Sequence, residues 1–511
     1  MLIVLPALGI WSGIRQGGGK LSGGYRRLSI KRRGIGLNKN AYSVNGSSAC
    51  RSARVEIKMK KYNMLKDSPG KSLFFFALPM ILGNLFQQFY NMADSVIVGQ
   101  CVGEDALAAV GASYSLTTVF IMIAIGGGIG ASVITSQYLG AKEYDRMKTS
   151  VFTALLTFAA VSVILGIFGF FMCGRILTAL RTPQNILPDA VLYLRIYFVG
   201  LPFLFMYNIL SSVFNALGNS KTPLYLLIFS SVLNVGLDFL MVLAFHMGVA
   251  GVAVATVMAQ GLSAVISFLL LIKALRGYGE RKEKGEVVYY SAKMLGGMVK
   301  IAIPSIIQQS IVSIGMLLVQ SVVNGFGSSV LAGYTSGIRI ESICIVPMIA
   351  TGNAVSTFTA QNLGAGSAER VKKGYRSAYG IVFGFGLFTF AVLSVFHRQI
   401  IAAFIEEGSG AASFATGDSY LEFMRFFFVF IGMKAITDGV LRGAGDVGVF
   451  TLSNLINLGI RVFVSFRFAS IWGVEAVWYA VPMGWIVNYV ISFLWYLTGK
   501  WSRKRIIRSD C

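Results

Sequence analysis

Two aspartates have the side chains most able to do chemistry in this sequence, because each interrupts a long apolar stretch. Asp94 lies within residues 72–99 and Asp238 within residues 223–245, and neither stretch contains a Lys or Arg. An ionised carboxylate inside a membrane is costly unless it is paired or hydrated, so such residues mark candidate functional sites. Asn234 precedes Asp238 by four positions, which places both on one face of a helix. Two carboxylates beside amide and hydroxyl oxygens suit Na⁺, or a proton shared between the acids.

The predicted depth of these residues in the membrane brings them together. If both chain ends lie on one side, Asp94 is about five residues from the far end of its span. Asp238 and Thr256 are each about seven residues from the same end of their own spans. At a rise of ~1.5 Å per residue, the three side chains fall within a few ångströms of one depth. We therefore expect one cation-coupling site formed by Asp94, Asn234, Asp238 and Thr256; the alternative is that they only satisfy hydrogen bonds between helices.

The composition requires that long helices position these residues. The 511-residue chain is 55% hydrophobic and only 13% charged, with a mean hydropathy of +0.68, whereas soluble domains are about a quarter charged. Backbone groups in lipid must be paired within a segment, which favours helices, and the alternating ten-residue segments of a barrel are absent. We predict an all-α integral membrane protein of twelve spans. They lie at 72–99, 106–136, 149–173, 188–216, 223–245, 249–275, 296–324, 330–359, 376–404, 418–441, 449–470 and 474–498.

The net charge of +23 has an explanation other than nucleic acid. Residues 1–71 hold fifteen Lys or Arg and two acids, and nothing in them resembles a folded nucleic-acid module. We expect residues 1–64 to be a basic, disordered extension, with the natural translation start at Met59 or Met64. The remaining positive charge lies mostly in short loops, where it has a topological meaning.

Charge in these loops predicts the orientation. Basic residues gather in alternate connections and in the tail at 502–511, while the loops at 100–105, 246–248, 325–329 and 471–473 contain none. The positive-inside rule then places both termini in the cytoplasm, with the protein in the plasma membrane of a prokaryote. The exceptions are Arg175, Arg181 and Arg398.

The two halves of the chain repeat each other. The matching pairs, 224 positions apart, are Gln137/Gln361, Leu139/Leu363, Gly140/Gly364, Ala141/Ala365, Arg146/Arg370 and Lys148/Lys372. At slightly different offsets, Pro79 matches Pro304 and Gly218-Asn219 matches Gly445-Asp446. Each half holds six spans, an even number, so the repeats are parallel. We expect a central cavity between an N-lobe (65–275) and a C-lobe (294–501), joined by a cytoplasmic linker at 276–293.

Three motifs carry a resemblance to a known family. They are Phe-Gln-Gln-Phe-Tyr-Asn-Met-Ala-Asp-Ser-Val-Ile-Val-Gly at 86–99, Leu-Ala-Ala-Val-Gly at 107–111 and Ser-Gln-Tyr-Leu-Gly-Ala at 136–141. With them the chain resembles the multidrug and toxic compound extrusion (MATE) family, in particular its prokaryotic branch with the DNA-damage-inducible F-type proteins and Na⁺–drug antiporters. The resemblance covers about residues 65–501. It implies a secondary antiporter that exports organic, cationic and amphipathic solutes in exchange for Na⁺ or H⁺, with the cation at Asp94, Asn234, Asp238 and Thr256.

Other polar residues within the spans are candidates for the solute cavity. They are Gln87, Gln88, Asn91, Asn208, Gln260, Gln308 and Glu341. In the C-lobe the counterpart of Asp238 is Arg461, which would repel a cation, so we expect Glu341 and Arg461 to form a structural ion pair. Recognition of the solute by Glu341 is the alternative. Lys434 and Asp438, four residues apart, could pair with each other.

Two other function classes compete with antiport. A flippase of a lipid-linked cell-envelope precursor is the alternative, although its cavity should be strongly basic. An enzyme is not expected, because the sequence shows no nucleophile–base pair, and Gly70-Lys71-Ser72 lacks the first Gly of a phosphate-binding loop. His246 and His397 have no metal-ligand spacing. We expect no cofactor beyond the coupling ion and no nucleic-acid partner, and a carrier that acts as a monomer.

Overall fold

The computed structural model describes residues 63–278, 288–405 and 410–504. Contacts divide the chain into residues 1–59 and residues 60–511, and the first unit lies outside the described residues. Nearly all of the predicted extension at 1–64, half of the linker at 276–293 and most of the tail at 502–511 therefore also fall outside them. Within the described part every regular element is a helix.

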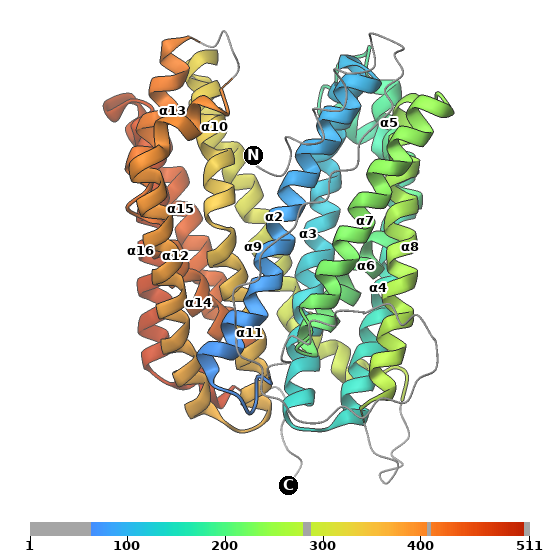
Figure 1. Cartoon of the computed structure of the whole chain (residues 1–511), viewed down its shortest axis with the longest axis vertical. Coiled ribbons are helices and arrows are strands. Elements are labelled where there is room, and N and C mark those ends of the chain that lie inside the picture. Colours follow the sequence, from blue (N-terminus) through green and yellow to red (C-terminus); the bar gives the residue numbers. More distant parts are fainter. Residues whose placement is uncertain (1–62, 279–287, 406–409, 505–511) are drawn as a thin grey trace, which may run out of the picture. The chain divides into compact units, whose positions relative to one another are not determined.

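Each half of the chain forms a set of long helices (Figure 1). The N-lobe consists of α2 (Pro69–Cys101), α3 (Glu104–Gly140), α4 (Tyr144–Ala179), α5 (Leu187–Val199), α6 (Leu201–Ala216), α7 (Lys221–Phe239), the π-helix η1 (Leu240–Ala244) and α8 (Gly248–Arg276). The C-lobe consists of α9 (Ala292–Asn324), α10 (Ser328–Cys344), α11 (Val346–Gly364), α12 (Ala368–Ala402), α13 (Ala411–Met424), α14 (Phe428–Ala444), α15 (Val447–Trp472), α16 (Glu475–Leu497) and the short 3-10 helix η2 (Lys500–Arg503).

These helices account for the twelve predicted spans. In the described residues, nine helical segments are long and apolar enough to cross a membrane, and two bent pairs, α5–α6 and α10–α11, bring the number to eleven. The pair α13–α14 occupies the position of the tenth predicted span, and its helices have only 14 and 17 residues. The twelve-helix, two-repeat fold predicted from the sequence is confirmed.

Three spans that the sequence predicts as continuous are broken. Helices α5 and α6 meet at an angle of 54°, and α10 and α11 at 40°. Pro202 and Pro347 lie in the first turns of α6 and α11, where a missing backbone N–H costs nothing but continuation of the preceding helix is disfavoured. Helices α13 and α14 are separated by residues 425–427.

The first helices of the two lobes are exchanged between the lobes. Leu73, Phe76 and Ile81 of α2 belong to a hydrophobic cluster built mainly from the C-lobe. Reciprocally, Met298 and Ile301 of α9 lie in a cluster built mainly from the N-lobe. Pro79 and Pro304, which the repeat matches, lie inside these two helices of 33 residues each.

The lobes are joined at one end by a reciprocal pair of hydrogen bonds. Gln137 of α3 donates from Nε2 to the carbonyl of Gly443 at 3.3 Å, and Gln361 of α11 donates to the carbonyl of Ala216 at 2.8 Å. The repeat alignment makes Gly443 the counterpart of Ala216. A Cβ on Gly140 would overlap the backbone of Gln361, and one on Gly364 would overlap that of Gln137. We call these contacts the glutamine seam.

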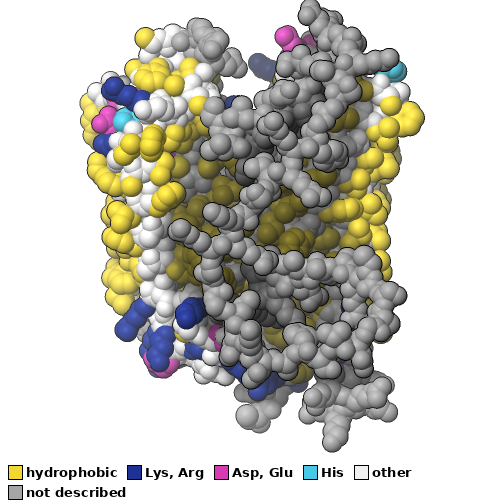
Figure 2. Space-filling view, viewed as in Figure 1, with side chains coloured by type: hydrophobic (Ala, Val, Ile, Leu, Met, Phe, Trp, Pro, Cys, Tyr) yellow, Lys and Arg dark blue, Asp and Glu magenta, His cyan; other side chains and the backbone are white. Residues whose placement is uncertain are grey.

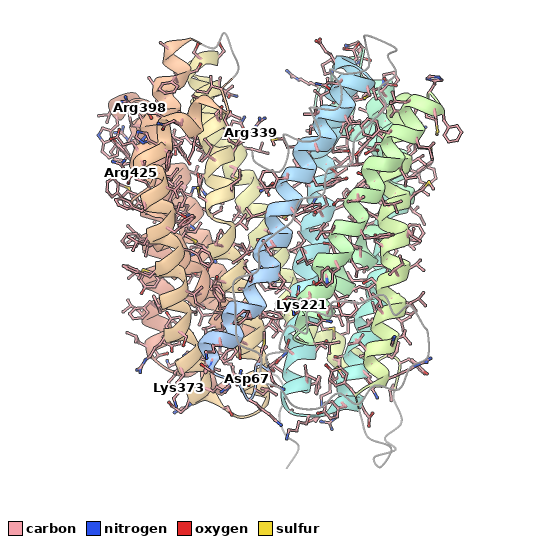
Figure 3. The ribbon with its side chains drawn as sticks, viewed as in Figure 1. Asp67, Lys221, Arg339, Lys373, Arg398 and Arg425 are labelled. Carbon is pink, nitrogen blue, oxygen red and sulfur yellow. The ribbon has the colours of Figure 1, made fainter. Side chains whose placement is uncertain are left out.

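The same end carries most of the loop charge and is called the basic end here. Figure 3 labels Lys221, Lys373 and Asp67 at this end, and Arg339, Arg398 and Arg425 toward the other. The short loops at the opposite end that contain Gly103, Phe326 and Gly473 have no Lys or Arg. Hydrophobic side chains cover much of the visible flanks between the two ends (Figure 2). An apolar belt of this kind fits a lipid bilayer.

Candidate functional site

Asp94 and Asp238 meet in the N-lobe. Asp94 lies on α2, and Asp238 is fully buried in the last turn of α7. Their carboxyl groups lie close enough to interact directly with each other. One oxygen of each, Oδ1, is buried and receives a hydrogen bond from no donor in the described part of the chain. The pair therefore has unused capacity to bind a cation or a proton.

Three further side chains surround the acids. Asn234 is 2% exposed, lies one turn before Asp238, and accepts a hydrogen bond from the Tyr90 hydroxyl. Its amide nitrogen is 3.4 Å from the Thr256 hydroxyl. With the amide turned over, its nitrogen instead donates to Asp238 Oδ2 at 3.3 Å, and its oxygen accepts from the Thr256 backbone at 3.2 Å. Either orientation links Asn234 to the neighbouring oxygens.

The local backbone explains why the groups converge. Helix α7 passes directly into the π-helix η1 after Asp238, and such wide turns often mark functional sites. Gly251 of α8 packs against Met241 and Met247 around this turn, at distances where a side chain would be crowded. The close approach of α8 places Thr256, just over one turn further along, beside Asn234.

The structure brings together the four residues predicted for cation coupling and adds two tyrosines. Tyr90 stands one turn before Asp94 on α2, and Tyr193 of α5 is close enough to both carboxyl groups to interact with their charge. The i, i+4 spacing of Tyr90 and Asp94 was visible in the sequence. Nothing in the sequence pointed to Tyr193, because the sequence does not show which helix faces the two acids. The six side chains supply carboxylate, amide and hydroxyl oxygens, which are the ligands that hard cations prefer.

A polar cavity of about 350 Å³ lies between the lobes toward the basic end. The N-lobe contributes Asn84, Ser132, Asn208, Ser211, Ser212 and Asn215. The C-lobe contributes Gln309, Asn353, Ser356, Thr357 and Arg442. The remaining lining is apolar, and no Asp or Glu takes part. Asn84 and Asp94 are ten residues apart on α2, so the acid pair lies ~15 Å beyond the cavity.

The residues predicted for the solute cavity are distributed over several places. Asn208 lines this cavity, and Gln309 lines it in place of its neighbour Gln308. Gln87 donates to Asn91 at 2.8 Å on an exposed face of α2, between the cavity and Asp94. Gln88, Gln260 and Glu341 are not part of the cavity wall.

The expected Glu341–Arg461 ion pair is wrong as a direct contact. Glu341 accepts a hydrogen bond from the Tyr420 hydroxyl and feels the Arg461 charge only over a longer distance. Nε of Arg461 has no hydrogen-bond partner among the described residues. Counting residues along the helices placed Glu341 and Arg461 at a similar depth in the membrane. In the structure, however, Tyr420 on α13 is the direct partner of the Glu341 carboxylate. The pairing of Lys434 with Asp438 is confirmed, at 3.0 Å.

Comparisons with known proteins show which family this chain resembles. A family model described as MatE matches residues 79–240 and 304–466, one segment in each lobe. "Probable multidrug resistance protein YpnP" of Bacillus subtilis (strain 168) is 31% identical over 451 residues, which are 88% of this chain and 99% of that protein. "Probable multidrug resistance protein YoeA" of the same organism is 29% identical over 454 residues, or 87% and 96% of the two chains.

A solved structure shares the fold. It is described as the outward-facing conformation of a multidrug resistance MATE family transporter of the MOP superfamily. The TM-score is 0.76 at 23% identity, and the match covers 88% of this chain and 99% of the other. The two matched segments of the family model and the paired helices of the lobes agree on the same internal repeat.

Proposed function

This chain belongs to the MatE family, and we propose that it is a secondary antiporter that exports organic solutes in exchange for Na⁺ or H⁺. It is a multi-pass membrane transporter rather than an enzyme. The relatives named above are described as multidrug resistance proteins, which supports an amphipathic organic solute, expected from the sequence to be cationic.

The observation that carries the proposal is the contact between Asp94 and Asp238. Two membrane-embedded acids in contact cannot both be ionised without a cation or proton between them. Asn234 and Thr256 supply neutral oxygens at the same place, so either Na⁺ or H⁺ can compensate the charge. Such a site is costly for stability and useful for coupling.

Coupling follows from differential affinity. A ligand shifts a carrier between two conformations only to the extent that it binds one of them more tightly. Entry of the cation from outside would stabilise the conformation that has released the solute. The cation-loaded carrier would then open to the other side, release the cation there and regain the conformation that binds the solute.

The direction of transport requires an orientation. We propose that the basic end faces the cytoplasm of a prokaryote, so that both termini lie inside, in line with the positive-inside rule. In this orientation the glutamine seam closes the cytoplasmic side and the acid pair lies in the outer half of the membrane.

Efflux from vesicles decides between the coupling ions and tests the proposal as a whole. The purified chain is reconstituted with a cationic dye inside the vesicles, and an Na⁺ gradient or a pH gradient is imposed separately. We expect one gradient to drive dye movement against its concentration difference. No gradient-driven movement of cationic, zwitterionic or anionic organic solutes would overturn the proposal. A lipid-linked pyrophosphate would need several cations around it, and the cavity wall holds one, Arg442.

A further inference from the structure

Arg442 is the charged group of the cavity wall, and it makes no direct ion pair with an acid of the described residues, although the charge of Asp438 acts on it from a longer distance. It lies in the last turn of α14, at the floor of the cavity next to the basic end. No ion pair joins it to any acid in the described residues, and the cavity wall contains no Asp or Glu. A cation kept in a membrane domain without a partner is a candidate for ligand binding.

The acid nearest along the chain is already occupied. Asp438 lies one turn before Arg442, but its carboxylate is bound by Lys434 at 3.0 Å, Asn454 at 3.3 Å and Ser492 at 3.0 Å. These partners belong to α14, α15 and α16, and none of them lines the cavity. The carboxyl end of α14 adds only about half an elementary charge of dipole, which does not neutralise a guanidinium.

Neutral groups hold the guanidinium in place and leave part of it free. Nη2 of Arg442 donates to Asn353 Oδ1 at 2.7 Å, and Nε donates to Ser356 Oγ at 3.3 Å. A guanidinium has five N–H donors in a fixed fork, so these two bonds orient it without using its whole donor set. The geometry leaves donors for a planar or tetrahedral anion.

The helix packing explains why Arg442 reaches the cavity wall. Gly352 of α11 and Gly439 and Gly443 of α14 lie at the contact between the helices, where an added Cβ would overlap the opposite backbone. Small residues at this spacing let two helices approach closely. Asn353 and Ser356 on α11 are thereby brought within reach of Arg442.

The internal repeat shows that this charge is not a requirement of the fold. The alignment of Gly218-Asn219 with Gly445-Asp446 makes Asn215 the N-lobe counterpart of Arg442. Both line the same cavity at the end of corresponding helices. The same architectural position is therefore served by an uncharged amide in one lobe and by a guanidinium in the other.

We propose that the floor of the central cavity is a binding site for a carboxylate or phosphate group of the transported solute, with Arg442 as its anchor. The proposal rests on the proposed function in taking the exported solute as the occupant. Asn353 and Ser356 are positioning residues. The surrounding Ser and Asn side chains of the N-lobe supply further neutral hydrogen bonds. A solute that also carries a cationic group would then be a zwitterion.

Equilibrium binding to the purified full-length chain in detergent tests this without any ion gradient. The probes are 4-phenylbutanoate, 4-phenylbutyl phosphate and the uncharged isostere 4-phenylbutanamide, and dissociation constants come from ligand-dependent shifts of thermal unfolding. We expect at least one anion to bind about ten- to a hundredfold more tightly than the amide, as for hydrogen bonds to charged groups. The stronger of the two anions identifies the group as carboxylate or phosphate.

Two variants assign the preference to Arg442. Arg442→Gln should reduce the ratio between anion and amide to near one, and Arg442→Lys should retain part of it. Arg339→Gln removes an exposed cation of the same lobe that is not part of the cavity wall, so the ratio should stay as in the unchanged protein (Figure 3).

Two results would overturn the proposal. One is equal binding of the anions and the amide to the unchanged protein. This result does not depend on whether any variant folds. The other is an undiminished anion preference in Arg442→Gln. Because no gradient is applied, a failure of cation coupling leaves this measurement intact, so the two proposals fail independently.

Discussion

At the scale of single residues, the charges within the helices differ in how they are satisfied. Asp438 has three donors, and Glu341 has the Tyr420 hydroxyl. Asp94 and Asp238 interact with each other, and Arg442 donates hydrogen bonds only to the neutral side chains Asn353 and Ser356. Charges with complete partner sets contribute to structure, whereas those that lack a counter-charge are positioned to bind something that supplies it.

The acid pair leads to the first prediction. Asp94→Asn, Asp238→Asn and the double variant should each abolish gradient-driven efflux while leaving folding nearly unchanged, since the amide is isosteric and uncharged. The double variant should be no worse than either single one, because groups that act as a unit are not additive. Vesicle efflux and melting temperature measure the two properties. Near-normal coupled transport by Asp238→Asn would remove this site from the mechanism.

The Tyr420–Glu341 contact gives the second prediction. Glu341→Gln keeps an acceptor for Tyr420 and should cost about 1 kcal/mol of stability. Tyr420→Phe removes the one donor that the described residues offer Glu341, and should cost about 1–3 kcal/mol. Thermal unfolding in detergent compares the variants. If the double variant Glu341→Arg with Arg461→Glu were more stable than either single variant, a direct ion pair would be indicated instead.

The sequence predicted some of these residues for a physical reason. Depth along a helix follows from counting residues, so the sequence alone places Asp94, Asp238 and Thr256 at one level of the membrane. Rotation about the helix axis and the identity of the facing helix do not follow from counting. Tyr193 and the Tyr420 contact of Glu341 depend on both, and the sequence did not reveal them.

At the scale of elements, the glutamine seam sets how closely the lobes approach. Gly140 and Gly364 each pack against the backbone of the glutamine in the other lobe, so the seam is a reciprocal contact between repeated segments. The sequence showed the Gln-x-Leu-Gly repeat but not its role, because internal similarity does not tell whether two copies touch. The sequence did not predict the breaks at Pro202 and Pro347, because an apolar stretch has the same hydropathy whether its helix is straight or bent.

The third prediction concerns this seam. Gly140→Ala or Gly364→Ala should push the lobes apart at the basic end by on the order of 1–2 Å, to restore van der Waals separation. Spin labels at Lys221 and Lys373, one in each lobe, should then show longer distances. Gly380→Ala on α12 is the matched control, because its Cβ would meet nothing within 4 Å. An unchanged distance distribution in both seam variants would contradict the interpretation.

At the scale of the whole molecule, two parallel repeats were predicted from residue matches at one offset, and the paired helices confirm them. The exchange of α2 and α9 between the lobes was not predicted. Both helices are apolar on most sides, so their composition fits either lobe equally well. Because of this exchange, each first helix packs against helices of both lobes.

The fourth prediction is the orientation of the whole bundle. In a background without the native cysteines, Lys373→Cys at the basic end should resist a membrane-impermeant thiol reagent in intact cells, whereas Ser328→Cys at the opposite end should react. Both positions are exposed, so a difference in labelling reports the side of the membrane rather than burial. After the cells are opened, Lys373→Cys should react as well, which controls for its reactivity. Labelling of Lys373→Cys but not of Ser328→Cys in intact cells would show that the basic end faces outward, opposite to the proposed orientation. The acid pair would then lie nearer the cytoplasm, and an inward cation gradient would reach it only through the end that the glutamine seam closes.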